Sequence, residues 1–396
     1  MFTCGGTAGH INPAIAVADE VLRCEPDAEV LFVGSCRELE NRLVPGAGYE
    51  LVNIKMSGLK RGFSAKALVF NIKTLKNLSA ARVRASGIIR EFAPDAAIGT
   101  GGYICYPVLK SAAKMGVPTF IHESNAAPGL TTKLLSATVD KVLVAFEGME
   151  AAYKRPGRVV FTGTPVRAGF AEKPDSGGLR GERGRLLVAS FWGSLGAEKM
   201  NEMMADFIKL NIDAGAFDHI HATGKHGGAA VMMGRLKQLG AADELPDGIE
   251  IREYIDDMAS VMSRADIVMC RAGGSTIAEL SAMGKPAVLV PSPYVTDDQQ
   301  HRNAEQAGKA GGVVVLQEGA CSGRQLFDTI VAILGDEERR SAMAEAQWRL
   351  GAPGAASAVA KMLLEAARRP GETRRPDETR RPDETRRPDE TRRPGA

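Results

Sequence analysis

The chain of 396 residues is long enough for two domains of ordinary size, and its 44% hydrophobic content allows a sizeable core. Its net charge is +2, but the part from Arg368 onward carries 10 arginines and 7 acids, so the remainder, with 40 bases and 41 acids, is nearly neutral. This balance argues against nucleic-acid binding. The six cysteines show no CxxC spacing, which excludes an evident disulfide framework, and neither a signal peptide nor a membrane-spanning run is expected.

Short apolar runs and helical segments alternate through the first half of the chain. The expected strands are 1–4, 29–33, 96–99, 119–122, 141–144 and 159–161, and the first expected helix is 14–23. Glycine turns follow two of these strands, at 5–10 and 99–102. The alternation predicts a parallel sheet with helices on both faces, and the turns fall at carboxyl ends of strands, where open α/β sheets bind ligands.

A polar, glycine-rich break at 173–185 separates a second alternating series. Its expected strands are 186–189, 219–222, 249–251, 267–270, 287–290 and 313–316, with closing helices at 341–348 and 355–367. We therefore predict an α/β protein with two Rossmann-like domains that face each other across a cleft, which is a favoured ligand site. The predicted domains are 1–164 and 165–340, and the helices in 341–367 are expected to pack back on the first domain.

The stretch 265–304 has the most pronounced ligand-binding pattern. A strand at 267–270 leads through Gly273-Gly274-Ser275 into a helix expected from Thr276, and Glu279 has the spacing of a capping box with Thr276. Such a turn directs free backbone N–H groups and a positive helix end at a diphosphate. The alternative is an ordinary tight turn. The run Asp297-Asp298-Gln299-Gln300, with Asn303, favours a ligand because these groups can bind sugar hydroxyls.

One segment, 51–90, contains nine bases and no acid, interleaved with apolar side chains. This composition suits an anionic membrane surface. The residues expected to contact lipid are Lys66, Phe70, Ile72, Lys73, Leu75 and Lys76. The alternative is an amphipathic helix whose apolar side packs on the sheet.

The C-terminal repeat Arg-Arg-Pro-Asp-Glu-Thr, regular from Arg374, has no apolar residue and a proline every sixth position. We interpret 368–396 as a disordered appendage, whose removal should leave fold and turnover intact. His219, His221 and His226 suggest a metal site, but no carboxylate or cysteine is positioned with them, so no metal site is predicted.

Seven motifs in order along the chain point to one family. They are 5–10, 99–103, 122–130, 163–167 (Gly-Thr-Pro-Val-Arg), 254–258 (Tyr-Ile-Asp-Asp-Met), 271–279 (Arg-Ala-Gly-Gly-Ser-Thr-Ile-Ala-Glu), and 298–300 with Asn303. In order and spacing the chain, up to about residue 367, resembles the MurG-type glycosyltransferases of peptidoglycan synthesis, which have the two-domain GT-B fold. Two features depart from the family. Trp192 and Leu195 stand in the third glycine loop, 192–197, and the first strand is short, which suggests either a misplaced start codon or a frayed sheet edge.

The resemblance implies transfer of N-acetylglucosamine from UDP-N-acetylglucosamine to the 4-hydroxyl of lipid I, with inversion. The product is lipid II, needed for cell-wall growth, cell shape and division. It implies no tightly bound cofactor; any effect of a divalent cation would be stimulatory and would not use a protein metal site. Partners would be both substrates and the anionic inner leaflet, and the location the cytoplasmic side of the membrane. Rival functions are a UDP-N-acetylglucosamine 2-epimerase and a lipid glucosyltransferase of the same fold.

The resemblance also assigns residues. The first domain would take the acceptor, with Gly101, Gly102, Tyr103 and Glu123 on that side. The second domain would bind the donor, with some residues of the first domain also at the donor site. The assigned donor-site residues are Thr7, Ala8, Gly9, Asn125, Arg167, Ser194, Ile255, Gly274, Ser275, Thr276, Ile277, Ala278, Glu279, Gln299 and Gln300.

The acceptor hydroxyl must lose a proton, and His10 is the expected base. It follows the first glycine turn at the carboxyl end of a strand, and histidine is the side chain that most readily exchanges a proton near neutral pH. Alternatively, His10 caps the first helix or only binds the acceptor. Asp298 and Glu123 are rival bases, although each is better explained by ordering a loop.

Overall fold

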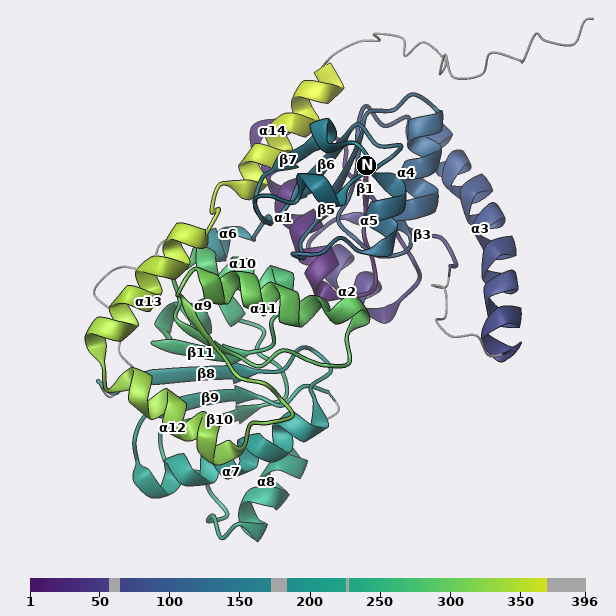
Figure 1. Cartoon of the computed structure of the whole chain (residues 1–396). Coiled ribbons are helices and arrows are strands. Elements are labelled where there is room, and N and C mark those ends of the chain that lie inside the picture. Colours follow the sequence, from purple (N-terminus) through teal and green to yellow (C-terminus); the bar gives the residue numbers. More distant parts are fainter. Residues whose placement is uncertain (57–64, 172–183, 226–227, 369–396) are drawn as a thin grey trace, which may run out of the picture.

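The computed structural model describes residues 1–56, 65–171, 184–225 and 228–368, with only the backbone of 65–76 and 296. The chain forms two α/β domains, each built on one parallel sheet, which confirms the predicted architecture (Figure 1). The predicted membrane-contacting side chains from Lys66 to Lys76, the residue His226 and the repeat beyond Arg368 lie outside the described part.

The first sheet has the strand order β3-β2-β1-β4-β5-β6-β7, and all its pairs are parallel. Its strands are β1 (Phe2–Thr3), β2 (Leu31–Gly34), β3 (Glu50–Asn53), β4 (Ala97–Gly99), β5 (Thr119–Glu123), β6 (Lys141–Val144) and β7 (Val159–Phe161). One face is covered by α1 (Ala8–Cys24) and α14 (Ala355–Arg368), the other by α3 (Ala65–Phe92), α4 (Cys105–Lys114) and α5 (Leu130–Leu135). The central strands β1, β4 and β5 are buried throughout because helices cover both faces.

The second sheet has the order β10-β9-β8-β11-β12-β13, also parallel. Its strands are β8 (Leu187–Phe191), β9 (Asp218–Ala222), β10 (Ile249–Arg252), β11 (Ile267–Cys270), β12 (Ala287–Leu289) and β13 (Val313–Val315). One core joins it to α7 (Glu198–Ala214), α8 (Ala229–Gln238), α12 (Gly323–Leu334) and α13 (Glu337–Leu350); the other joins it to α6 (Ala168–Ala171), α9 (Met258–Arg264), α10 (Gly274–Ala282) and α11 (Gln299–Lys309). The remaining elements are α2 (Glu38–Gly46) and the short 3₁₀ turns Glu150–Ala152, Pro156–Arg158 and Thr296–Asp298.

In each sheet the chain adds successive strands first toward one edge and then toward the other. This switch lies between β1 and β4 in the first sheet and between β8 and β11 in the second. The loops that follow these four strands contain the predicted glycine turns. Open α/β sheets bind ligands at such switch points because neighbouring loops diverge there and leave a crevice. The topology therefore gathers the motifs at the carboxyl edges of the two sheets.

Two expectations about the first domain are wrong. The strand β1 is central, paired with β2 and β4 on its two sides, and is not a frayed edge. The first helix begins at Ala8, six residues before its expected start, with Pro13 inside it. Pro13 is the sixth residue of α1, where it removes one i→i−4 hydrogen bond, and the glycine turn leads directly into the helix.

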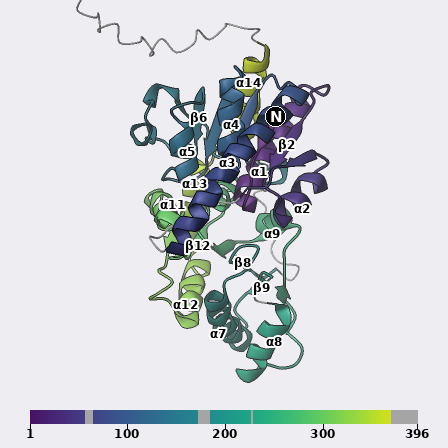
Figure 2. The same cartoon turned by 90° about the vertical axis from the view of Figure 1, so that its right-hand side faces the viewer.

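The two closing helices pack on different domains. On α14, Val359, Ala360 and Leu363 are buried against α1, whereas α13 contacts α10 and α12 of the second domain. The end of the chain therefore crosses from the second domain to the first (Figure 1). The helix α3 packs on α4 through Ala81 and Ala85, and Figures 1 and 2 show it continuing past α4 along the side of the first domain.

Candidate active site

Two pockets meet between the domains. We call the first the N-domain pocket; it is lined mainly by the turns after β1 and β4 and by the loop after β5. We call the second the interdomain pocket; it is lined by the start of α1 and by the loops after β8, β10 and β11. Four residues line both: Thr7, His10, Asn125 and Gln299. A group bound in one pocket can therefore reach a group bound in the other beside His10.

The imidazole of His10 is held in one tautomer. Its Nδ1 lies 2.8 Å from the carbonyl oxygen of Gly5. A carbonyl only accepts hydrogen bonds, so Nδ1 carries the hydrogen and, in the neutral ring, Nε2 is left with a lone pair. The backbone is fixed as well, since Thr100 Oγ1 donates to the His10 carbonyl oxygen at 2.6 Å. His10 is thus oriented as a proton acceptor at the junction of the pockets.

Gly101 makes room for this ring. Its φ is +126°, and a Cβ there would lie 2.3 Å from His10 Cδ2. We expect Gly101→Ala to displace the imidazole and to lower kcat by about 10², since small misplacements of a catalytic group have effects of that order. Gly116→Ala is the matched control, because Gly116 also has positive φ (+81°) but no atom within 4 Å of the added Cβ. Steady-state rates of both variants test this; equal losses would attribute the effect to backbone strain alone.

The carboxylate of Glu123 orders the loop after β5. Its Oε1 accepts from Asn125 Nδ2 at 2.8 Å, and its Oε2 accepts from the Gly129 N–H at 2.9 Å and from Thr132 Oγ1 at 2.8 Å. With both oxygens engaged and the side chain 5% exposed, Glu123 is poorly placed to take a proton. The rival base Asp298 is paired with His301 at 2.5 Å. His10 remains the best candidate.

The interdomain pocket contains the start of helix α10, a feature that suits an anion. Helix α10 starts at Gly274, and its first residues Gly274, Ser275 and Thr276 line the pocket with Ser194 and Arg167. The helix N-terminus supplies free N–H groups and positive potential, and Arg167 adds a full charge. This arrangement suits a diphosphate.

The position of Glu279 corrects the expected capping box. The N-cap is Gly273, without a side-chain cap, so Glu279 is in the second turn of α10 and not at its start. Its side chain is half-buried and lines the pocket, and within the described residues no hydrogen bond to its carboxyl group is found. Burial raises the pKa of Glu279 to about 7, partly offset by Arg167. A carboxyl group with free oxygens in a pocket is suited to accept hydroxyl groups of a ligand.

Most residues assigned from the sequence reach the pockets. Gly101, Gly102, Tyr103 and Glu123 line the N-domain pocket, and every assigned donor residue lines the interdomain pocket except two. Those two are Ile277, whose side chain is 2% exposed in the core, and Ala278, which packs against the same core. They lie on the inner face of α10 and contribute packing.

Asn303 has a role that its motif did not indicate. It is fully buried, and its Oδ1 accepts from the Ala126 N–H at 2.8 Å. Its Nδ2 donates to Asn125 Oδ1 and to the Ala272 carbonyl oxygen, both at 3.1 Å. Asn303 therefore joins the loop after β5 to the second domain and is not free to bind a sugar. A second residue whose place at the site was not predicted is Arg42, which lines the interdomain pocket. It lies on α2, a short polar helix that the sequence pattern did not indicate.

Trp192 does not block the third glycine loop. Its side chain is 3% exposed and packs in the core on α7, while Leu195 is exposed at the pocket rim. The indole lies over the guanidinium of Arg271, with Cζ 5.8 Å from the ring centroid. Arg271 in turn pairs with Glu318 at 2.7 Å. The departure from the family pattern thus adds a largely buried packing residue to the pocket wall.

The histidines of β9 form a buried pair away from both pockets. Ser190 Oγ lies 2.8 Å from His219 Nε2 and 2.7 Å from His221 Nδ1. Burial lowers the pKa of both rings, so they are neutral core residues. Within the described ranges no group of three or more histidine, cysteine or acidic side chains is placed to hold a metal ion.

Two family models match nearly all of the two domains. The glycosyltransferase family 28 N-terminal domain matches residues 1–144, and the C-terminal domain of the same family matches residues 187–361. The chain belongs to glycosyltransferase family 28. As a member of family 28 it is a hexosyltransferase, and the turns at His10 and at Gly274 lie one in each matched domain.

Curated relatives in family 28 share one name, UDP-N-acetylglucosamine--N-acetylmuramyl-(pentapeptide) pyrophosphoryl-undecaprenol N-acetylglucosamine transferase. That of Acetivibrio thermocellus is 41% identical over 350 residues, 88% of this chain and 92% of its own. That of Desulforudis audaxviator is 35% identical over 364 residues, 90% and 95% of the two chains. These relatives place the chain among the MurG-type members of family 28, as the motifs predicted.

Solved structures agree on the fold. The MurG crystal structure from Acinetobacter baumannii has a TM-score of 0.69 at 24% identity and covers 92% of this chain and 98% of its own. The UDP-GlcNAc 2-epimerase from Neisseria meningitidis, bound to UDP-GlcNAc, has a TM-score of 0.64 at 13% identity, with 92% and 99% coverage. A transferase and an epimerase thus share this architecture, so fold alone does not separate them.

Proposed function

We propose that this protein transfers N-acetylglucosamine from UDP-N-acetylglucosamine to the 4-hydroxyl of lipid I and so forms lipid II, with inversion at the anomeric carbon. The observation that carries the proposal is the position of His10, which lines both the N-domain pocket and the interdomain pocket. The names of the relatives support the choice of substrates, and the position of His10 between two pockets supports its role as the base.

The bonds made and broken follow from this placement. The acceptor hydroxyl in the N-domain pocket gives its proton to His10 Nε2 while its oxygen attacks the anomeric carbon of the donor. The bond from that carbon to the diphosphate breaks on the opposite face, and UDP leaves with the electron pair. Because the transition state carries positive charge at the sugar and negative charge on the diphosphate, the N-terminus of α10 and Arg167 stabilise departure.

Two further roles at this site are proposed. Glu279 would accept the ribose hydroxyls, and Gln299 and Gln300 would bind hydroxyls of the sugar. We further propose that any divalent cation acts on the diphosphate itself, since positive charge for it comes from Arg167 and α10.

The deciding experiment is a transfer assay. Purified protein with UDP-N-acetylglucosamine and a lipid I analogue should yield a lipid-linked disaccharide and one UDP per product. The rival epimerase would convert the donor without an acceptor and would release no UDP during that conversion. Donor turnover that needs no acceptor would contradict the transferase proposal, and product from UDP-glucose in preference would favour the lipid glucosyltransferase.

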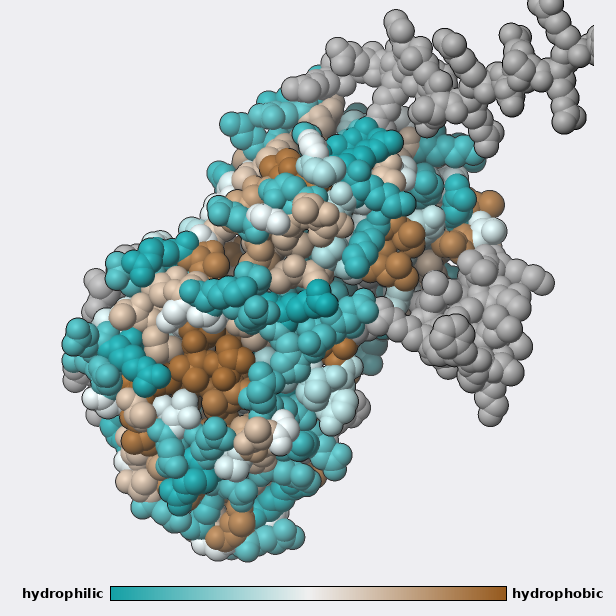
Figure 3. Space-filling view, viewed as in Figure 1, coloured by the Kyte–Doolittle hydropathy of each residue, from teal (hydrophilic) through white to brown (hydrophobic). Residues whose placement is uncertain are grey.

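We also propose that the protein docks peripherally on an anionic membrane. In the described part of the chain no helix is long and apolar enough to cross a membrane. Support comes from the acid-free segment 51–90 and from α5, where Leu130 and Leu134 are 43% and 52% exposed beside the N-domain pocket. Figure 3 shows hydrophobic surface in the region of α5. A lipid-linked acceptor would enter from that side.

Charge reversal on α3 tests this docking. We expect the triple change of Lys73, Lys76 and Arg84 to glutamate to abolish binding to anionic liposomes, since each base near such a surface adds about 1 kcal/mol. Arg84 is chosen over Arg82, whose Nε is buried. A matched triple reversal of Lys309, Arg324 and Arg349, exposed on the second domain, is the control. Cosedimentation measures binding; turnover of a short-chain soluble acceptor should persist, and retained liposome binding would exclude α3.

A further inference from the structure

One face of α2 in the first domain contacts the second domain. Glu38 and Arg42 are four residues apart and therefore lie on the same side of the helix. Glu38 Oε1 is 2.9 Å from Lys225 Nζ, in the loop after β9. The guanidinium carbon of Arg42 is 5.4 Å from the centroid of the Tyr254 ring, in the loop after β10. Two contacts one helical turn apart therefore cross between the domains.

The second of these contacts borders the interdomain pocket. Arg42 and Leu43 line it from the first domain, and Glu253, Tyr254 and Ile255 line it from the second. The first domain thus contributes more to this pocket than the turn at the start of α1. Arg42 covers part of the Tyr254 ring, and Tyr254 is still 39% exposed to solvent.

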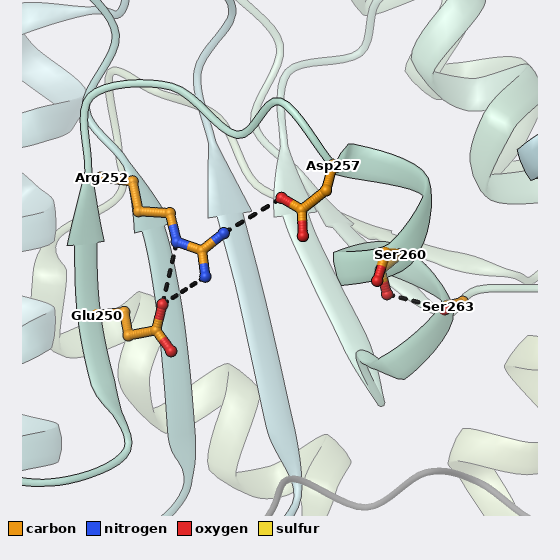
Figure 4. Close-up of polar contacts among 5 residues, drawn as sticks. All are labelled: Glu250, Arg252, Asp257, Ser260 and Ser263. Carbon is orange, nitrogen blue, oxygen red and sulfur yellow. Dashed lines mark hydrogen bonds and ion pairs between the residues drawn. The ribbon is translucent and has the colours of Figure 1, made fainter.

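The loop that carries Tyr254 is fixed at both ends. Arg252 Nε donates to Glu250 Oε2 at 3.0 Å on β10, and Arg252 Nη1 donates to Asp257 Oδ1 at 3.2 Å at the start of α9. Figure 4 shows this guanidinium lying between the two carboxylates, where it ties β10 to the residue that precedes α9. The loop between them, and with it Tyr254, is therefore tied to its own domain by contacts that do not involve α2.

We propose that α2 is a clasp for the donor: Arg42 stacked on Tyr254, and Glu38 paired with Lys225, hold the first domain over a UDP-sugar bound in the interdomain pocket. The clasp rests on the proposed function, because it assumes that the interdomain pocket holds this donor. Residues of the clasp act by positioning the domains and take no part in bond making. Loosening it raises the donor KM and the dissociation constant of UDP more than it changes kcat.

Exposed contacts of these two kinds each change an affinity by about two- to fivefold. We therefore expect Arg42→Ala to raise the Kd for UDP and the donor KM by that factor, with the KM for the acceptor analogue unchanged. Glu38→Lys and Lys225→Glu each place like charges together and should weaken donor binding similarly. The exchanged pair, Glu38→Lys with Lys225→Glu, restores opposite charges and should return the Kd to within about twofold of wild type.

The matched control exchanges the charges of Glu202 and Arg235, an exposed pair 2.8 Å apart that lies within the second domain. This exchange and its single variants should leave UDP affinity unchanged. Calorimetry gives the Kd, steady-state rates give both KM values, and a thermal melt verifies folding. An exchanged Glu38–Lys225 pair no better than its single variants, or an unchanged Kd in Arg42→Ala, would overturn the clasp. Wild-type protein that binds no UDP would refute the proposed function as well.

Discussion

Replacing His10 by alanine is expected to lower kcat by about 10²–10⁴, the usual contribution of a positioned general base. His10 Nδ1 donates to the Gly5 carbonyl oxygen at 2.8 Å, so only Nε2 is free to take the acceptor proton. Donor affinity should stay nearly unchanged, because most of the interdomain pocket belongs to the second domain. Rates with a lipid I analogue and calorimetry with UDP-N-acetylglucosamine measure the two effects.

The variant His10→Asn separates proton transfer from positioning. Its amide nitrogen can take the place of Nδ1 and donate to Gly5, but it offers no base at the position of Nε2. We expect it to be as slow as His10→Ala. A rate within tenfold of wild type for either variant would move the base to another residue, and a lost donor affinity would make His10 a binding residue.

Replacing Glu279 by glutamine is expected to weaken binding of UDP-N-acetylglucosamine by about 10- to 100-fold. The reason is that hydrogen bonds to a charged group contribute more than neutral ones, and a carboxylate can accept both ribose hydroxyls whereas an amide offers one oxygen. Thr276→Ala is a useful comparison, since it removes one neutral hydroxyl from the same pocket and should cause a smaller loss. Equal losses in the two variants would contradict a special role of the carboxylate.

The pH dependence provides a second measurement on Glu279. Burial raises its pKa to about 7 in the free protein, and only the ionised form accepts two hydroxyls. Donor affinity should therefore be full above pH 7 and fall by up to about tenfold per unit as the pH decreases below it. The sign for stability is opposite: the folded pKa exceeds the ordinary value of 4.5, so ionisation of Glu279 destabilises the unliganded fold as the pH rises from 4.5 through 7.

Two variants assign this pH dependence. Glu279→Gln should bind the donor with an affinity that is flat between pH 6 and 8, whereas His10→Asn should keep the wild-type slope. The donor itself does not titrate in this range, because its diphosphate is esterified at both ends. A slope that survives in Glu279→Gln would place the titrating group elsewhere.

Local sequence determined every strand except β3, which was not predicted, together with the glycine turns, including the turn that leads into α10. Apolar runs such as 267–270 are unambiguous because both faces of a central parallel strand are buried, and a glycine turn is recognisable because few other residues allow close backbone approach. From these, the two-domain architecture and most pocket-lining residues followed. The family motifs added His10 as the candidate base and Glu279 as a candidate donor-binding residue.

Tertiary structure alone decided which of these groups meet. The central place of β1, the burial of Asn303 between the domains and the contact of Arg42 with Tyr254 join residues far apart in sequence. No local pattern encodes such contacts, because they depend on how two sheets and their loops face each other. The tautomer of His10 is different in kind, since it is set within one turn by the Gly5 carbonyl oxygen, five residues away in the sequence. The sequence thus specified the parts of the site, and packing of the two domains decided which of them meet.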